Sequence, residues 1–261
     1  MEPSAGCIAL RAIWCVCIEL GSSKTPVPSP ISWRCRTCYQ ITTPSLATVP
    51  PPKLAELLSR IRQLSEACKA GDSRSPESFR DLVSQLLNLT VMKNPQGAVR
   101  LFTSDAQPKR FVLGGRNGPV DPIPLNDRRY LRLAMTLELV DTPEGSRLKV
   151  FESSLQYQLD REGKKWIFRY DYLRHTAGQH PPAHFQIRAK LTEGSVIRGS
   201  QTLERIHFPT SRVPLEAIIN LLATDFRVRC NESPEVWRPA LAESERRFFQ
   251  IAHIPLSVFP V

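Results

Sequence analysis

Apolar residues recur at three- and four-residue steps between residues 54 and 87, which predicts two amphipathic helices. The apolar positions of the first helix are Leu54, Leu57, Leu58, Ile61, Leu64 and Cys68. This helix runs to about Ala70, and Gly71 ends it. The run Ser75-Pro76-Glu77 then supplies an N-cap, a first-turn proline and a first-turn acid for the second helix. We expect the two helices to form a hairpin that packs on the rest of the fold.

From about residue 99 the hydrophobic period changes to two, which indicates strands. Residues 99–102 and 110–113 are short strand candidates. The glycine-rich run 114–119 follows them. It lacks the Gly-Lys-Ser/Thr ending of a phosphate loop, and no helical pattern comes after it. We therefore predict a turn there.

Three longer alternating segments follow, at residues 131–139, 148–159 and 166–172. Short turns separate them, which predicts an antiparallel meander. The alternation of the second segment shifts near Glu152, which suggests a β-bulge. Residues 183–191 alternate again, with His184 on the face opposite Phe185. A last short strand, 203–208, is expected to pair antiparallel with this segment.

Helical signals return after Pro209. Apolar spacing predicts a helix from Leu215 to Phe226, with a short helix opening at Ser233 and a final one from Leu241 to His253. The predicted fold class is α+β: an antiparallel sheet of about five strands in a meander, with N- and C-terminal helices packed on it. We expect residues 53–261 to form this single domain.

Residues 1–52 differ from the rest of the chain, since they hold five of the seven cysteines and seven prolines between positions 26 and 52. Three interpretations remain open for them. Cys15, Cys17, Cys35 and Cys38 could form a zinc knuckle, although only one true CxxC pair is present. Residues 7–18 could be a signal peptide, but Glu2 and Arg11 are atypical of one. We favour a disordered extension.

The composition is that of an ordinary globular protein, with 41% hydrophobic residues. Lys and Arg outnumber Asp and Glu by 35 to 25, so the formal charge is +10, which favours polyanionic partners. No apolar run has the roughly 18 residues of a membrane span. The cysteine distribution does not indicate a disulfide framework, so we expect a reducing, cytoplasmic location without membrane association.

Four of the five histidines lie between residues 175 and 207. Antiparallel pairing of the last two strands would bring their ends, and the N-terminus of the following helix, to one edge of the sheet. The candidate catalytic residues are His175, His180, His184, His207 and Asp171. The candidate anion-binding residues are Arg169, Arg174, Arg188, Arg205 and Arg212. The helix N-terminus near Pro214 would add free N–H groups.

Three functions fit this cluster. The favoured one is action on a phosphate-bearing ligand, RNA or a nucleotide, with histidines as acid and base and arginines holding the phosphate. The second is a metal-dependent hydrolase with His175, His180, His184 and Asp171 as ligands, although Pro181-Pro182 keeps the last two histidines off one regular helix. The third is a non-catalytic module that binds nucleic acid or protein. The sequence decides neither whether the protein is an enzyme nor which cofactor it uses.

The stretch Trp166-Ile-Phe-Arg-Tyr-Asp-Tyr172, followed by His175, His180-Pro-Pro-Ala-His184 and the helix to Phe226, resembles the TumE-type toxins of bacterial toxin–antitoxin modules. The resemblance covers residues 166–226 of a longer chain and rests on the order of these features. It implies a nucleic-acid or translation target, with an antitoxin as a possible protein partner. It points to Arg169, Asp171, His175, His180 and His184.

Overall fold

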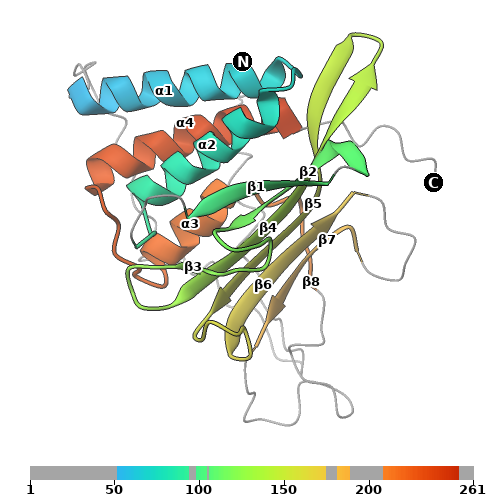
Figure 1. Cartoon of the computed structure of the whole chain (residues 1–261). Coiled ribbons are helices and arrows are strands. Elements are labelled where there is room, and N and C mark those ends of the chain that lie inside the picture. Colours follow the sequence, from blue (N-terminus) through green and yellow to red (C-terminus); the bar gives the residue numbers. More distant parts are fainter. Residues whose placement is uncertain (1–51, 94–97, 105, 175–180, 189–207, 253–261) are drawn as a thin grey trace, which may run out of the picture. The chain divides into compact units, whose positions relative to one another are not determined.

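An antiparallel sheet forms the centre of the fold in the computed structural model, which describes residues 52–93, 98–104, 106–174, 181–188 and 208–252 (Figure 1). The strand order is β1-β2-β4-β5-β6-β7-β8, and β3 pairs with β4 beside this path. The strands are β1 (Val99–Ser104), β2 (Gln107–Gly115), β3 (Ile123–Pro124), β4 (Tyr130–Thr142), β5 (Gly145–Gln158), β6 (Trp166–Leu173), β7 (Ala183–Ile187) and β8 (Phe208–Pro209).

Helices from both ends of the described chain lie on one face of this sheet (Figure 1). They are α1 (Pro52–Lys69), α2 (Ser75–Leu89), α3 (Leu215–Thr224) and α4 (Pro234–Ala252). The predicted α+β class is therefore confirmed. The predicted pair of C-terminal helices is wrong, because α4 is one helix that contains Pro239. This proline lies in the second turn, where its ring removes only the bond to the carbonyl of Glu235.

The meander is confirmed as β4, β5, β6 and β7, each antiparallel to the next. The bulge is confirmed too, since the register moves from Thr136 opposite Glu152 to Leu137 opposite Val150. In β8, Phe208 pairs with Phe185 and Pro209 with His184, as expected. The estimate of about five strands is too low. The reason is that β2 joins the meander by pairing with β4, a non-local contact that alternation alone does not reveal.

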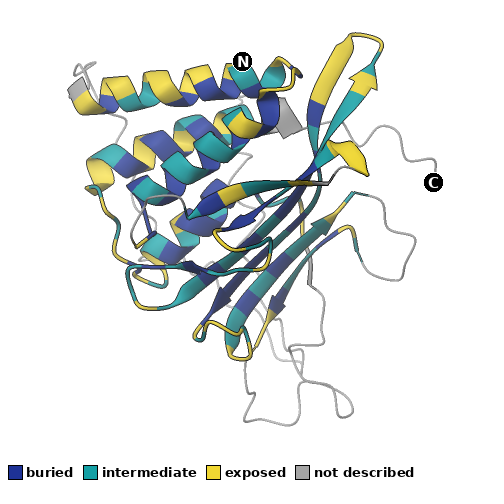
Figure 2. Cartoon of the chain, viewed as in Figure 1, coloured by how far each residue is buried: buried dark blue, intermediate teal, exposed yellow. Residues whose placement is uncertain are grey.

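The core lies between the sheet and the helices, and one set of alternate strand residues fills it (Figure 2). Leu133, Leu155, Tyr157 and Tyr170 are fully buried there. The rings of Phe168 and Phe226 lie 5.5 Å apart, centroid to centroid, and both contact Tyr157. Aromatic rings from two strands and the segment after α3 therefore join sheet and helices in one core.

Gly71 ends α1, as predicted, and its φ of +68° places it in the left-handed region. A Cβ atom at this position would lie 1.7 Å from the carbonyl oxygen of Ser146 in β5. The turn between α1 and α2 therefore needs glycine both for its conformation and for its approach to the sheet. The turn predicted at residues 114–119 is confirmed in part: Gly114 and Gly115 still belong to β2, and the chain turns after them, with a bridge between Gly115 and Gly118.

The predicted extension, residues 1–52, lies outside the described residues except for Pro52, where α1 begins. None of the described helices is both long enough and apolar enough to cross a membrane.

Candidate functional site

Two rows of side chains cross the outer face of the sheet, which is the face opposite the helices. Because residues two apart on a strand share a face, the members of both rows lie on this side. The backbone register aligns the first row as Ala134, Ser154, Asp171 and His184. It aligns the second row as Arg132, Gln156, Arg169 and Gln186.

Asp171 lies between the guanidinium of Arg169 and the imidazole of His184 in these rows. Its Oδ2 accepts a hydrogen bond from Arg169 Nε at 2.6 Å. The same oxygen lies 3.6 Å from His184 Nε2, which makes an ion pair when the imidazole is protonated. The exposed fraction of the side chain falls from 38% for Arg169 to 23% for Asp171 and 12% for His184. The carboxylate is therefore partly accessible, and the imidazole is mostly covered.

The ring of His184 is oriented by a contact with Pro181, three residues earlier in the chain. Its Nδ1 lies 3.1 Å from the carbonyl oxygen of Pro181, an acceptor only, so Nδ1 bears a hydrogen. Nε2 is then the nitrogen that can gain or lose a proton, and it faces Asp171. This is the arrangement of a histidine fixed for proton transfer at one nitrogen.

Arg169 contacts Asp171 through Nε alone. Its two terminal nitrogens form no hydrogen bond within the described part of the chain. A guanidinium fork of this kind matches two oxygens of a phosphate. Arg169 can therefore hold the carboxylate and still present its fork to an anion.

Small side chains adjoin this group on the neighbouring strands. Ser154 lies opposite Asp171, and Ala134 lies opposite Ser154. Both residues are half-buried. Neither side chain is long enough to cover the Asp171 carboxylate. The surface beside Asp171 is therefore formed by short side chains.

Arg188 has a different neighbourhood from Arg169. Its guanidinium donates to the carbonyl oxygen of Lys164, and its backbone N–H donates to Ile167 at 2.9 Å. These contacts join the residue after β7 to β6 and to the turn between β5 and β6. Arg188 therefore has a structural role in addition to its predicted role in anion binding.

Arg174 and Arg212 both contact aromatic rings near the end of β6. The Arg174 guanidinium lies 5.7 Å from the Phe151 ring. The Arg212 guanidinium lies 4.4 Å from the ring of Tyr172 and 5.1 Å from that of Phe248. Burial and the neighbouring Arg174 lower the pKa of Arg212. The predicted anion-binding arginines therefore do not form one group. Arg169 lies on the outer face, whereas Arg174 and Arg212 lie near the end of β6.

The N-terminus of α3 already holds a buried acid, Glu216. Burial raises the pKa of this carboxyl group to about 7, although a hydrogen bond from Ser244 Oγ at 2.5 Å opposes the shift. The Val213 N–H, just before the helix, donates to the Tyr170 hydroxyl at 2.9 Å. The helix end is therefore occupied by groups of the chain itself, which weakens the expectation that it binds an external anion.

His175, His180, His207 and Arg205 lie outside the described residues, so their roles stay predictions. Within the ranges that are described, no three His, Cys, Asp or Glu side chains are placed to hold a metal ion. The alternative ligand set is untested, because two of its three histidines are in the undescribed segment.

Sequence reasoning missed one polar group that supports the core. The Tyr157 hydroxyl donates to Asp127 Oδ2 at 2.5 Å and accepts from an Arg129 terminal nitrogen at 2.7 Å. Burial and Asp127 raise the pKa of Tyr157, so the phenol stays protonated. These residues are 28 to 30 positions apart, and the sequence contains no signal that pairs them.

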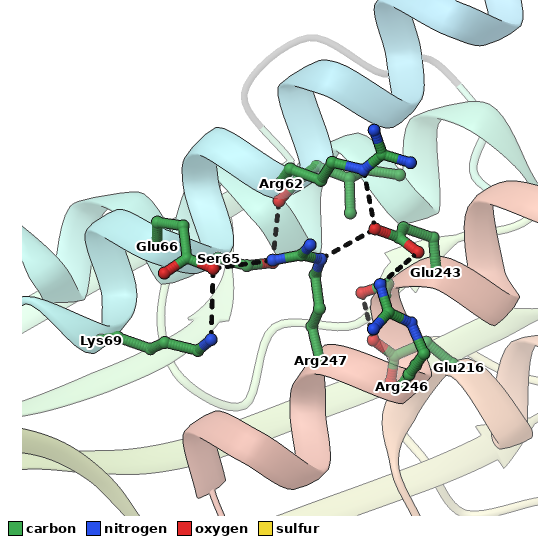
Figure 3. A network of polar contacts seen from close by, with 10 residues as sticks. Arg62, Ser65, Glu66, Lys69, Glu216, Glu243, Arg246 and Arg247 are labelled. Atoms are coloured by element: carbon green, nitrogen blue, oxygen red, sulfur yellow. Dashed lines mark hydrogen bonds and ion pairs between the residues drawn. The ribbon is translucent and has the colours of Figure 1, made fainter.

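A second polar group joins α1 to α4 on the helix side (Figure 3). The Glu243 carboxylate accepts hydrogen bonds from Arg62, Arg246 and Arg247, at 2.9, 2.9 and 2.8 Å. Arg247 also donates to Glu66 in α1 at 2.8 Å. The arginines lower the pKa of Glu243 to about 2 despite the opposing effect of burial. We assign this group to helix packing rather than to ligand binding, because the carboxylates and guanidinium groups satisfy one another.

Comparison of the chain with protein-family models, curated proteins and solved structures found no match.

Proposed function

We propose that this protein acts on a phosphate-bearing ligand, RNA or a nucleotide, at the outer face of its sheet. The observation that supports this most strongly is the Asp171 carboxylate held between Arg169 and His184, 2.6 Å and 3.6 Å away. Arg169 would bind the phosphate through its terminal nitrogens, and His184 would move a proton through Nε2. The net charge of +10 agrees with a polyanionic ligand.

With RNA as the ligand, the chemistry is a transesterification. The 2′-hydroxyl attacks the adjacent phosphorus, its proton passes to His184 Nε2, and the bond from phosphorus to the 5′ oxygen breaks. Asp171 then faces the protonated ring and stabilises its charge. The leaving 5′ oxygen takes a proton from a second acid, for which His175, His180 and His207 stay the candidates.

The resemblance to TumE-type toxins supports the same target class. A toxin of this kind would act on nucleic acid or translation, and an antitoxin would be its protein partner. The protein would then be an RNA-directed enzyme of the cytoplasm.

A second candidate is a non-catalytic RNA-binding module. The fold favours this candidate in one respect, since a sheet with helices on one side and an open face on the other is a known platform for single-stranded RNA, and arginine planes can stack on bases. Arg132 and Arg169 lie in one row, on either side of Gln156. In such a module these side chains would contact the RNA, and His184 would only position Asp171.

The test compares RNA cleavage by the full chain with cleavage by His184→Ala and by Arg60→Ala, a change on the exposed side of α1. We expect His184→Ala to lower the rate by about 10²- to 10⁴-fold at unchanged thermal stability, because it removes the acid–base group. Arg60→Ala should cleave as the parent does. DNA of the same sequence should stay intact, since it lacks the 2′-hydroxyl.

The contrary results are equally specific. Cleavage that His184→Ala leaves unchanged would refute the catalytic role. RNA binding without cleavage, weakened stepwise by loss of Arg132 and Arg169, would establish the binding module instead. Cleavage that needs an added divalent ion and stops with a chelator would favour the metal-dependent hydrolase.

A further inference from the structure

The edge strand β1 carries an aromatic residue on the outer face of the sheet. Val99 is buried in the core, and Leu101 packs against it. Alternation along the strand therefore places Arg100 and Phe102 on the opposite, outer face. The register pairs Phe102 with Val112 of β2, which lies on the same face. Both of these apolar side chains are half-buried, and neither belongs to the core formed by the described residues.

Phe102 begins a third row of side chains on the outer face, next to the row that contains Asp171. The register continues this third row through Val112, Thr136, Glu152 and Leu173. Four strand spacings separate β1 from β6, which amounts to about 19 Å at the usual distance between paired strands. A ligand that contacts both Arg169 and Phe102 must therefore be a polymer.

The turn after β2 covers the sheet at the far end of the Asp171 row. Gly114 lies on the outer face, because the residues on either side of it in β2 face the core. A Cβ atom at Gly114 would lie 2.4 Å from the Cα of Pro119, so Pro119 sits on the outer side of the sheet here. A polymer that leaves Asp171 across the sheet is stopped by this turn at β2. The path beside the turn leads over Val112 and Phe102.

The Phe102 ring and the Arg100 guanidinium are both available to a ligand. Within the ranges that the structure describes, the ring contacts no other aromatic ring, and Arg100 is exposed and forms no ion pair. Glu152, the acid of the third row, accepts a hydrogen bond from Thr136 at 3.4 Å and lies 3.9 Å from Arg110. The charge beside Phe102 is therefore positive, and the nearest acid of its row is engaged with other residues.

We infer that Phe102 is a base-stacking residue for single-stranded RNA, with Arg100 binding the adjoining phosphate. This inference rests on the proposed function for the Asp171 end of the path, but stacking can be tested without cleavage. Aromatic side chains on an open sheet face stack on unpaired bases, whereas the bases of a duplex are already stacked on one another. A nucleotide supplies an aromatic plane and an anion together, which matches Phe102 beside Arg100. An apolar protein surface would leave the arginine without a counter-charge.

The experiment measures binding of single-stranded RNAs of two and eight nucleotides to the full chain, with 2′-O-methyl groups to prevent cleavage. Phe102→Leu removes the ring but keeps an apolar side chain, and Phe102→Trp keeps an aromatic plane as the matched control. We expect Phe102→Leu to bind the eight-nucleotide RNA at least about fivefold more weakly than the parent. Phe102→Trp should bind it at least as tightly as the parent. The dinucleotide, which is too short to reach β1 from the Asp171 group, should bind the three proteins alike.

A second pair of variants tests the phosphate contact. Arg100→Gln should weaken binding of the eight-nucleotide RNA, and its plot of log affinity against log salt should flatten by about 0.7. Arg60→Gln removes the same charge from an exposed position on α1 and should behave as the parent does. Equal salt slopes for the two variants would overturn the role of Arg100. Thermal melting establishes that each variant is folded.

Nuclear Overhauser effects test the stacking without any substitution. In the parent saturated with the eight-nucleotide RNA, they should connect the ring protons of Phe102 with base protons or H1′ protons of the RNA. A saturated complex without such connections would overturn the inference.

The inference and the proposed function fail in different ways. Equal affinity of the parent and Phe102→Leu for the eight-nucleotide RNA would overturn the stacking role and leave the effect of His184→Ala on cleavage intact. RNA cleavage unaffected by His184→Ala would refute the proposed catalytic role and leave the difference between Phe102→Leu and Phe102→Trp intact.

Discussion

The two faces of the sheet are built from the same strands but from opposite kinds of residue. On the helix side, Leu133, Leu155 and Tyr170 are fully buried, and aromatic rings join β6 to the segment after α3. On the outer side, Ser154, Asp171 and His184 lie in one row. Within β6, Tyr170 and Asp171 are neighbours in sequence and belong to the two opposite faces. Buried apolar residues on the helix side stabilise the fold, and polar residues on the outer side are available for the proposed function. Substitutions on the helix side should therefore lower stability, and substitutions on the outer side should lower activity.

The largest expected effect on stability comes from Phe168→Ala. This ring is buried among Tyr157, Phe185 and Phe226, so its loss should lower the free energy of unfolding by about 3–5 kcal/mol. Ile167→Ala, the adjacent residue on the outer face, should cost less than about 1.5 kcal/mol. Denaturant unfolding of both variants measures the difference. Equal losses would mean that the two faces are packed alike.

The turn after α1 should be nearly as sensitive. Gly71→Ala forces a Cβ atom to within 1.7 Å of the Ser146 carbonyl oxygen at a positive φ, so we expect a loss of about 2–4 kcal/mol. Gly118→Ala meets no atom within 4 Å and serves as the control, with a change below about 1 kcal/mol. Thermal melting distinguishes them. A stable Gly71→Ala protein would contradict the close approach of this turn to β5.

Glu216 should make stability depend on pH near neutrality. Its folded-state pKa of about 7 lies above the usual value of 4.5. The folded state therefore holds the proton more tightly, and stability should fall as the pH rises from about 4.5 through 7. The total loss is about 3 kcal/mol, because each unit of pKa difference corresponds to about 1.4 kcal/mol. Glu216→Gln should remove this slope and be more stable than the parent at pH 8. A slope that persists in Glu216→Gln would assign it to another group.

The smallest effect is expected at the helix junction. Glu243→Gln weakens three contacts with arginines and should cost about 1–2 kcal/mol at neutral pH. Because the pKa of Glu243 is lowered to about 2, its contribution is present above about pH 4.5 and is lost as the pH falls toward 2. Glu56→Gln, on the exposed side of α1, is the control. Urea unfolding at pH 7 and pH 3 tests both, and equal curves for the two variants would contradict the role of Glu243.

Local patterns predicted the meander and the outward position of His184, because alternation reports directly on which face a strand residue occupies. The shift near Glu152 likewise revealed the bulge. Pairing between distant segments was beyond such patterns. They could not show that β2 pairs with β4, or that Arg174 leaves the predicted arginine group and lies against the Phe151 ring. These depend on tertiary packing, as does the continuation of α4 through Pro239.

The most direct test of the account is an NMR titration of the full chain with a single-stranded RNA, following backbone amides and the histidine ring nitrogens. The account predicts that Arg169, Asp171 and the Nε2 signal of His184 shift together, while the amides of α1 and α2 stay in place. Shifts confined to the helices, with the His184 ring unchanged, would contradict the claim that the outer face of the sheet is the functional surface.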